Sequence, residues 1–170
     1  TWNSRHLCKP PKKGSASTLK HAINLISPHD IFGITETCMT AESLAAIPLP
    51  LPQSHMHWHG FGTEKTKGVT LSIRKSFLSL FSSYKVMLFE GDENLYGRLI
   101  FLRTNSEFGA LDVALGYFDV QSPANRMHMM RRIKGLTRPH AHTIILGDFN
   151  FVMSTFDRVR NTSEHGVIYH

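Results

Sequence analysis

The chain has 170 residues, of which 41% are hydrophobic, enough for one globular domain with a buried core. Nineteen Lys and Arg side chains against thirteen Asp and Glu give a formal net charge of +6, which favours a polyanionic partner without requiring one. The composition argues against a membrane partner, since no run approaches the roughly 18 apolar residues of a membrane span. The two cysteines have no metal-ligand spacing and indicate a reducing, intracellular compartment, nuclear or cytoplasmic.

The first third of the chain alternates strand and helix signals. Apolar residues at the i, i+3, i+4 and i+7 positions of 19–26 predict an amphipathic helix, because that spacing places them on one face. Ser17 can cap the start of this helix, and Pro28 lies just past its end. The other elements expected here are a strand remnant at 1–4, a basic loop at 9–17, a buried strand at 30–35, a short helix from Thr40 to Ala46 and an extended Pro-rich linker at 48–52.

The middle of the chain is rich in strand signals. Strands are expected at 55–60, 68–74, 84–89, 98–103 and 110–117, with a turn at 91–94. The spacing of apolar residues indicates a helix over 125–135, and the last clear strand is 143–147. Helices at both ends around many strands predict a single α/β or α+β domain over 1–170, in which helices cover two sheets.

Two carboxylate signals follow buried strands. Glu36 comes directly after the run 30–35, and Asp148 follows an apolar run within the segment Gly-Asp-Phe-Asn of 147–150. Because open α/β layers place reactive groups at strand ends, the two acids could meet at one rim and share a divalent cation. Mg²⁺ prefers one or two carboxylates with waters and phosphate oxygens. The alternatives are a solvated Glu36 and a turn in which Asp148 and Asn150 bind loop backbone.

These segments, together with Trp2-Asn3 near the start, resemble the endonuclease/exonuclease/phosphatase family, most closely the endonuclease domain of non-LTR retrotransposons. The resemblance implies a four-layer α/β sandwich and a Mg²⁺- or Mn²⁺-dependent phosphodiesterase whose partner is DNA or another phosphodiester. It also implies that Glu36 binds the metal and that Asp148 orients the attacking water. Phosphoryl oxygens would be held by three further side chains, Asn3, Asn150 and Tyr117.

Further candidates for phosphate contacts lie on a helix and a loop. Asn125 and Arg126 begin the predicted helix, where backbone donors and a guanidinium could hold phosphate; a capping residue and a surface arginine are the alternatives. Lys12 and Lys13 belong to one of two basic clusters that could bind DNA backbone or serve only solubility. For Tyr117, the alternative to a phosphate contact is a packed aromatic side chain.

Three alternating histidines suggest a zinc site as an alternative to the carboxylate site. His55, His57 and His59 share one face if this segment is a strand, and two imidazoles with a third ligand could hold zinc. No Glu or Cys stands nearby at a recognisable zinc spacing. We therefore favour a solvated strand face over a zinc site.

The resemblance is incomplete in two places. His6 occupies a position where the family usually has Gly, and the family's closing Ser-Asp-His segment has no counterpart after Asp157, where His165 follows a Glu instead. We therefore expect a sandwich that is incomplete at its C-terminus, lacks the final strands of the family and is inactive as isolated. The alternatives to an endonuclease are a catalytically inactive remnant that at most binds nucleic acid, and a phosphatase of lipid or small phosphate esters.

Overall fold

The computed structural model describes residues 1–5, 7, 18–47, 50–63 and 66–150. It also gives the backbone of two short strands, β9 Arg160–Asn161 and β10 Ile168–Tyr169, which pair with each other. Several residues singled out above fall outside these ranges: His6, Lys12, Lys13, Ser17, Asp157 and His165.

The first sheet has the strand order β1-β2-β4-β3. Its strands are β1 Trp2–Asn3, β2 Ile31–Thr35, β3 His55–Gly60 and β4 Val69–Arg74. Strand β1 runs parallel to β2, whereas β4 is antiparallel to both β2 and β3. Successive side chains of a strand point to opposite faces, so the apolar Val69, Leu71 and Ile73 of β4 share the face that is buried between the two sheets.

The second sheet has the order β5-β6-β7-β8. Its strands are β5 Ser83–Met87, β6 Leu99–Ser106, β7 Gly109–Tyr117 and β8 Ala141–Asp148. The strand predicted at 98–103 continues to Ser106 because it pairs with the whole of β7, from which only a two-residue turn separates it. Strand β8 runs parallel to β7, so the two strands end at the same edge, with Asp148 opposite Tyr117.

Four helices complete the described part of the chain. They are α1 Thr18–Ile26, α2 Ala41–Ala45, α3 Lys75–Leu78 and α4 Pro123–Leu136. Thr40 caps α2 as predicted, but the cap of α4 is Ser122, and α4 therefore starts two residues before the predicted position. Helix α3 was not predicted, because four residues are too short for a periodic signal. None of the helices in the described residues is long and apolar enough to cross a membrane.

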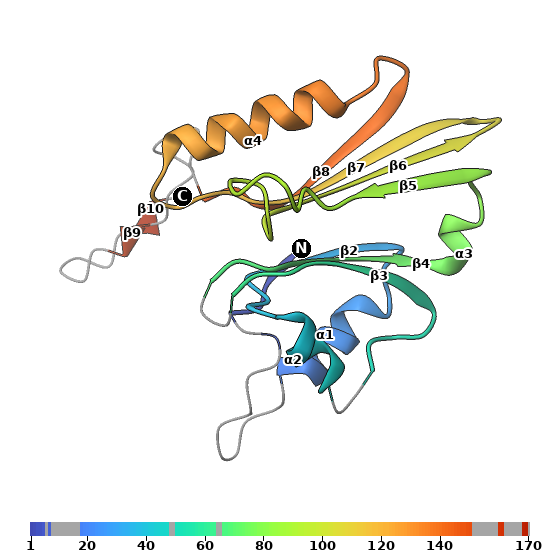
Figure 1. Cartoon of the computed structure of the whole chain (residues 1–170). Coiled ribbons are helices and arrows are strands. Elements are labelled where there is room, and N and C mark those ends of the chain that lie inside the picture. The colour runs from blue at the N-terminus through green and yellow to red at the C-terminus, as the bar shows by residue number, and fades with distance from the viewer. Residues whose placement is uncertain are drawn as a thin grey trace.

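The elements stack in four layers (Figure 1). Helix α4 covers the outer face of the second sheet, the two sheets pack face to face, and α1 and α2 cover the first sheet on the other side. The cores of the three interfaces are separate: one lies between the sheets, one under α4 and one under α1. The predicted four-layer α/β sandwich is confirmed.

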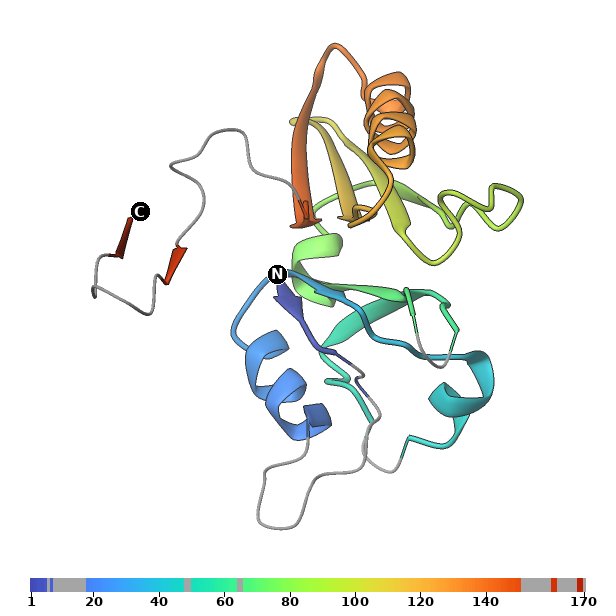
Figure 2. The same cartoon turned by 90° about the vertical axis from the view of Figure 1, so that its left-hand side faces the viewer.

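The carboxyl ends of four strands gather at one end of this sandwich. Strands β1 and β8 are edge strands of their sheets and lie on the same side of the molecule, where the N-terminus approaches the end of β8 (Figure 2). Because β1 is parallel to β2 and β8 is parallel to β7, the loops that follow each pair lie at one edge of their sheet, and hydrogen bonds between the sheets bring the two edges together at one rim.

Candidate active site

Four of the side chains predicted from sequence converge at this rim. Asn3 Nδ2 donates a hydrogen bond of 2.9 Å to Asp148 Oδ2, which joins residues 145 positions apart. The Tyr117 hydroxyl donates a hydrogen bond of 2.9 Å to Glu36 Oε1, which joins the two sheets. All four groups come from the carboxyl ends of strands, where strand direction brings them together.

Glu36 has a strained backbone that its neighbours hold in place. Its φ is 52°, in the left-handed region that non-glycine residues rarely occupy. On one side, Ser4 donates from its backbone N to Thr35 O and from its hydroxyl to Thr35 O and Glu36 O. On the other side, Thr37 N donates to Gly68 O. Strain of this kind persists only where surrounding bonds fix it, and it concentrates at functional sites.

Asp148 is fixed through both carboxylate oxygens. Asn3 donates to Oδ2, and the backbone N of Asn150 donates to Oδ1 at 3.2 Å. The preceding residue must be glycine: the φ of Gly147 is 149°, and a Cβ atom there would lie 1.8 Å from the carbonyl oxygen of Gly116. The close contact of these two glycines lets the ends of β7 and β8 approach each other.

Tyr117 is both packed and polar. Its ring belongs to the core between the sheets, and 9% of the residue is exposed. Burial raises the pKa of its phenol well above the ordinary value, and the hydrogen bond and negative charge of Glu36 add to the effect. The phenol therefore remains protonated at neutral pH and acts as a hydrogen-bond donor, not as a base.

The other predicted phosphate ligands hold loops together. Asn150, whose φ is 50°, donates from Nδ2 to Phe118 O and ties the loop after β8 to the loop after β7. Asn125 Nδ2 donates to Asp119 Oδ2, and Arg126 donates to the backbone oxygen of Asp119. An amide nitrogen has two hydrogens, so these bonds leave Asn125 and Asn150 one donor each.

Sequence reasoning missed two residues that lie beside the site, Arg98 and Asp119. Arg98 forms an ion pair with Asp119, with 3.1 Å between Nη2 and Oδ2, and its guanidinium carbon lies 5.2 Å from the centre of the Tyr117 ring. A positional signal existed, because Arg98 directly precedes β6, which is antiparallel to β7, the strand that ends in Tyr117. Antiparallel pairing places the beginning of one strand beside the end of the other, and Tyr117 N indeed donates to Arg98 O.

The rim contains oxygen atoms that could serve as ligands of a hard cation. Glu36 Oε2 makes no hydrogen bond to any described residue, and Asp148 and Asn3 contribute further oxygens nearby. The described residues contain no group of three or more His, Cys, Asp or Glu side chains placed to hold a metal. A cation here would thus have one or two carboxylates plus water, the set that Mg²⁺ accepts.

The interpretation of the histidine row as a solvated strand face is wrong. His55 is buried, and its Nε2 donates to His29 O at 2.8 Å. His57 pairs with Ser72 Oγ and donates to Pro52 O, while His59 pairs with Thr70 Oγ1. These polar partners on the neighbouring strand and loop give each imidazole at least one hydrogen bond.

Burial also keeps two of these imidazoles neutral. It lowers the pKa of His57, and it lowers that of His59 to about 4, with the neighbouring His57 adding to the effect. The row is thus a polar, hydrogen-bonded part of the sheet, and it includes no metal-binding group among the described residues.

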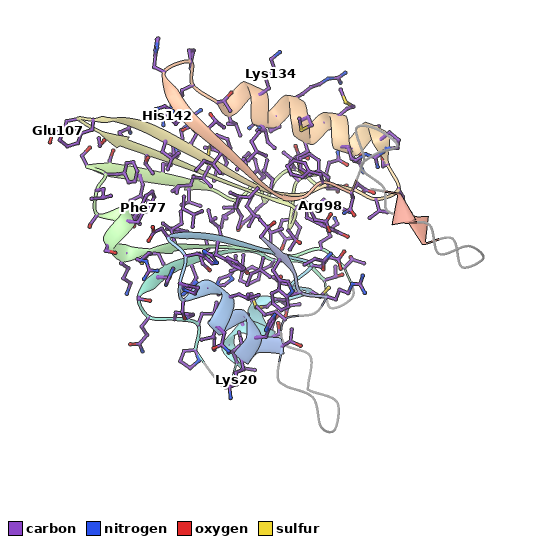
Figure 3. The ribbon with its side chains drawn as sticks, turned by 180° about the vertical axis from the view of Figure 1, so that it is seen from behind. Lys20, Phe77, Arg98, Glu107, Lys134 and His142 are labelled. Atoms are coloured by element: carbon purple, nitrogen blue, oxygen red, sulfur yellow. The ribbon has the colours of Figure 1, made fainter. Side chains whose placement is uncertain are left out.

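The second of the two basic clusters in the sequence, formed by Arg131, Arg132, Lys134 and Arg138, divides into two parts. Arg131, Arg132 and Lys134 are exposed on α4, whose outer face carries Lys134 in Figure 3. Arg138 instead binds both carboxylate oxygens of the fully buried Asp112. Only the α4 part is thus available to a polyanion.

Fold and site together define a class of α/β-sandwich proteins in which carboxylate, amide and phenol groups meet at the ends of two facing sheets. Residues 1–166 match the Endonuclease/Exonuclease/phosphatase family, and the chain belongs to this family. A comparison with curated proteins gave no match.

Solved structures share the fold. The AP endonuclease LMAP from Leishmania major has a TM-score of 0.64 at 17% identity, over 99% of this chain and 60% of that one. The APE2 catalytic domain of Xenopus laevis has a TM-score of 0.61 at 19% identity, over 95% and 60%. D. rerio TDP2, complexed with single strand DNA product, has a TM-score of 0.59 at 15% identity, over 89% and 59%. At such identities the likeness shows the fold alone, and the chain spans 59–60% of these structures.

Proposed function

We propose that the rim is a metal-dependent phosphodiester-cleaving site of endonuclease type. The observation that carries the proposal is the convergence of Asn3, Glu36, Tyr117 and Asp148 through two hydrogen bonds between distant segments. Packing alone does not require two carboxylates to be gathered at one half-buried rim, whereas phosphodiester hydrolysis needs an oriented water and stabilisation of negative charge on the phosphate.

Each side chain has a role that its contacts favour. Glu36, with one oxygen bound by Tyr117 and the other not hydrogen-bonded to any described residue, would hold a Mg²⁺ or Mn²⁺ ion. When bound, such an ion polarises the phosphate and stabilises the leaving oxygen. Asp148, a carboxylate held by Asn3 and Asn150, would accept a hydrogen bond from the attacking water and orient it toward phosphorus.

The remaining groups would hold the phosphate. Tyr117 stays protonated, and its single hydroxyl hydrogen, now donated to Glu36, would be donated to a phosphoryl oxygen instead when substrate binds. Asn3 and Asn150 each have an amide hydrogen left to donate, because each uses one in the bonds described. The predicted contributions of Asn125, Arg126, Lys12 and Lys13 to phosphate binding remain part of the proposal.

DNA is the substrate we favour. The formal net charge of +6 and the exposed basic residues of α4 suit a polyanion. One structure of the same fold is complexed with a single strand DNA product, and another is an AP endonuclease. We also propose a retroelement origin, supported by the segments 2–3, 35–37 and 147–150; the absence of a reverse-transcriptase frame in the adjoining genomic sequence would contradict it.

Metal binding tests the site directly. Calorimetry with Mn²⁺ should show one weak site in the wild-type chain and none in Glu36→Gln, because the amide removes the negative charge but keeps the size of the side chain. Glu90→Gln is the matched control, since Glu90 is exposed in the loop between β5 and β6. Equal Mn²⁺ binding by wild type and Glu36→Gln would overturn the assignment.

Cleavage separates the enzyme from the inactive remnant. Supercoiled plasmid is incubated with Mg²⁺ and either wild type or Asp148→Ala, and the rate of nicking is compared. Residues 1–170 contain no counterpart of the family's Ser-Asp-His segment, so we expect no difference when these 170 residues are tested alone. Nicking that depends on Asp148 would show that a group within these residues replaces the family's histidine.

A further inference from the structure

The ring of Tyr117 is held from two sides. At its edge, the hydroxyl donates to Glu36 Oε1 at 2.9 Å. Over its face, the guanidinium carbon of Arg98 lies 5.2 Å from the ring centre, within the range of a cation–π contact. Figure 3 shows Arg98 at one end of the sandwich, with Phe77 at the other. The side chain of Arg98 is only 14% exposed, so the contact is partly shielded from water.

Asp119 fixes the guanidinium in turn. Its Oδ2 lies 3.1 Å from Nη2 of Arg98, and its side chain is 16% exposed. Backbone donors of Gln121 and Ser122 bind Oδ1, and Asn125 Nδ2 binds Oδ2. Burial opposes ionisation of Asp119, but these hydrogen bonds and the charge of Arg98 outweigh it, and the pKa is lowered. The carboxylate is therefore charged and held in one place by the turn before α4.

We propose that Arg98, held by its ion pair with Asp119, is a positioning residue. Its contact over the ring of Tyr117 orients this ring so that the hydroxyl donates to Glu36. The inference rests on the proposed function in that Glu36 is taken as the metal ligand. It assigns Arg98 no contact with substrate or metal. It explains why a partly buried ion pair stands beside the site: three side chains in series, Asp119, Arg98 and Tyr117, set the orientation of one carboxylate.

Backbone geometry alone does not fix this orientation. Tyr117 N donates to Arg98 O at 2.7 Å, which places the Cα atoms but does not by itself set the side-chain angles of the tyrosine. The ring packs in the core between the sheets, and Arg98 adds a contact over one face of it. The guanidinium is planar and held by a carboxylate, which suits it to fix a ring face in a way that a flexible ammonium cannot.

The position of the ring can be read without any activity. The chain is labelled with 3-fluorotyrosine, and Tyr117→Phe assigns the ¹⁹F resonance of residue 117. Arg98→Met and Asp119→Asn should both move or broaden this resonance. Arg132→Met is the matched control, because Arg132 makes the same kind of contact with Phe89, at 5.5 Å, away from the site. An unchanged Tyr117 resonance in both Arg98→Met and Asp119→Asn would overturn the proposal.

Metal affinity then separates positioning from general support of the fold. Loss of a residue that orients a metal ligand typically weakens metal binding about 10–100-fold. We expect Arg98→Met to weaken Mn²⁺ binding about 10-fold in the wild-type chain but less than about 2-fold in a Tyr117→Phe background, where the bond to Glu36 is already lost. Arg98→Lys should restore only part of the affinity. Equal losses in both backgrounds would overturn the inference.

The two proposals can fail separately. If the wild-type chain binds no Mn²⁺, the proposed function fails, while the ¹⁹F comparison still decides whether Arg98 holds the ring. Circular dichroism of each variant shows whether it is folded. Should Arg98→Met fail to fold, Asp119→Asn carries the test, since it keeps the size of the side chain while removing the charge and one of the two acceptor oxygens.

Discussion

Replacing Gly147 by alanine should damage both the stability and the site of this protein. The φ of Gly147 is 149°, and the added Cβ would lie 1.8 Å from Gly116 O, 2.8 Å from its carbonyl carbon and 3.0 Å from its N. All three atoms are backbone of the paired strand β7, so no side chain can turn aside. Unfavourable φ costs about 1–3 kcal/mol and overpacking about 1–3 kcal/mol, which gives a loss of about 2–6 kcal/mol.

The same change elsewhere should have the opposite sign. Gly135 is exposed within α4, and a Cβ there would meet no atom within 4 Å. Gly135→Ala should stabilise the chain by about 0.5–1 kcal/mol, because alanine loses less backbone entropy in a helix. Urea unfolding of both variants, followed by circular dichroism, gives the comparison. A free energy of unfolding for Gly147→Ala equal to or above that of wild type would refute the reasoning.

Three further predictions concern charge. Burial lowers the pKa of His59 to about 4, below its unfolded value of 6.5, so this group contributes stability that is complete above pH 6.5 and lost as pH falls toward 4. In His59→Gln, the free energy of unfolding from urea titrations should therefore change less with pH in this window, by up to roughly 3 kcal/mol. Parallel pH profiles of the two proteins would contradict this. Arg138→Ala should cost about 3–5 kcal/mol because it leaves buried Asp112 unpaired, whereas Arg74→Ala, whose partner is 59% exposed, should cost less than about 1 kcal/mol; similar urea midpoints would contradict the difference. The logarithm of the DNA affinity, measured by fluorescence anisotropy, should fall linearly with the logarithm of the salt concentration, and less steeply once the exposed basic residues of α4 are replaced by alanine. Affinity that is constant with salt would rule out phosphate contacts.

The positions of most elements follow from local pattern. Alternating and continuous apolar runs predicted the strands of both sheets, and the helical spacing of apolar residues predicted α1. These signals are local because side chains repeat every two residues in a strand and about every 3.6 in a helix. The family's motifs added the four-layer arrangement, which periodicity does not give.

The histidine row shows where local pattern fails. Alternation correctly predicted that His55, His57 and His59 lie on one strand, but it could not say what that face would meet. The neighbouring strand supplies Ser72 and Thr70, so the imidazoles are hydrogen-bonded and partly buried. Solvation of a strand face depends on the strand beside it and the layer above it, and both come from distant parts of the chain.

The sequence by itself determined which groups the rim contains: Glu36 and Asp148 follow apolar strands, and Asn3 and Tyr117 match the family's motifs. Only the tertiary structure decided how they pair, Asn3 with Asp148 and Tyr117 with Glu36. It also brought Arg98, which carries no motif, over the ring of Tyr117. The physical reason is that a residue's own neighbours fix its secondary structure, whereas strand direction and the packing of two sheets fix which strand ends meet, and those depend on contacts between residues far apart in the chain.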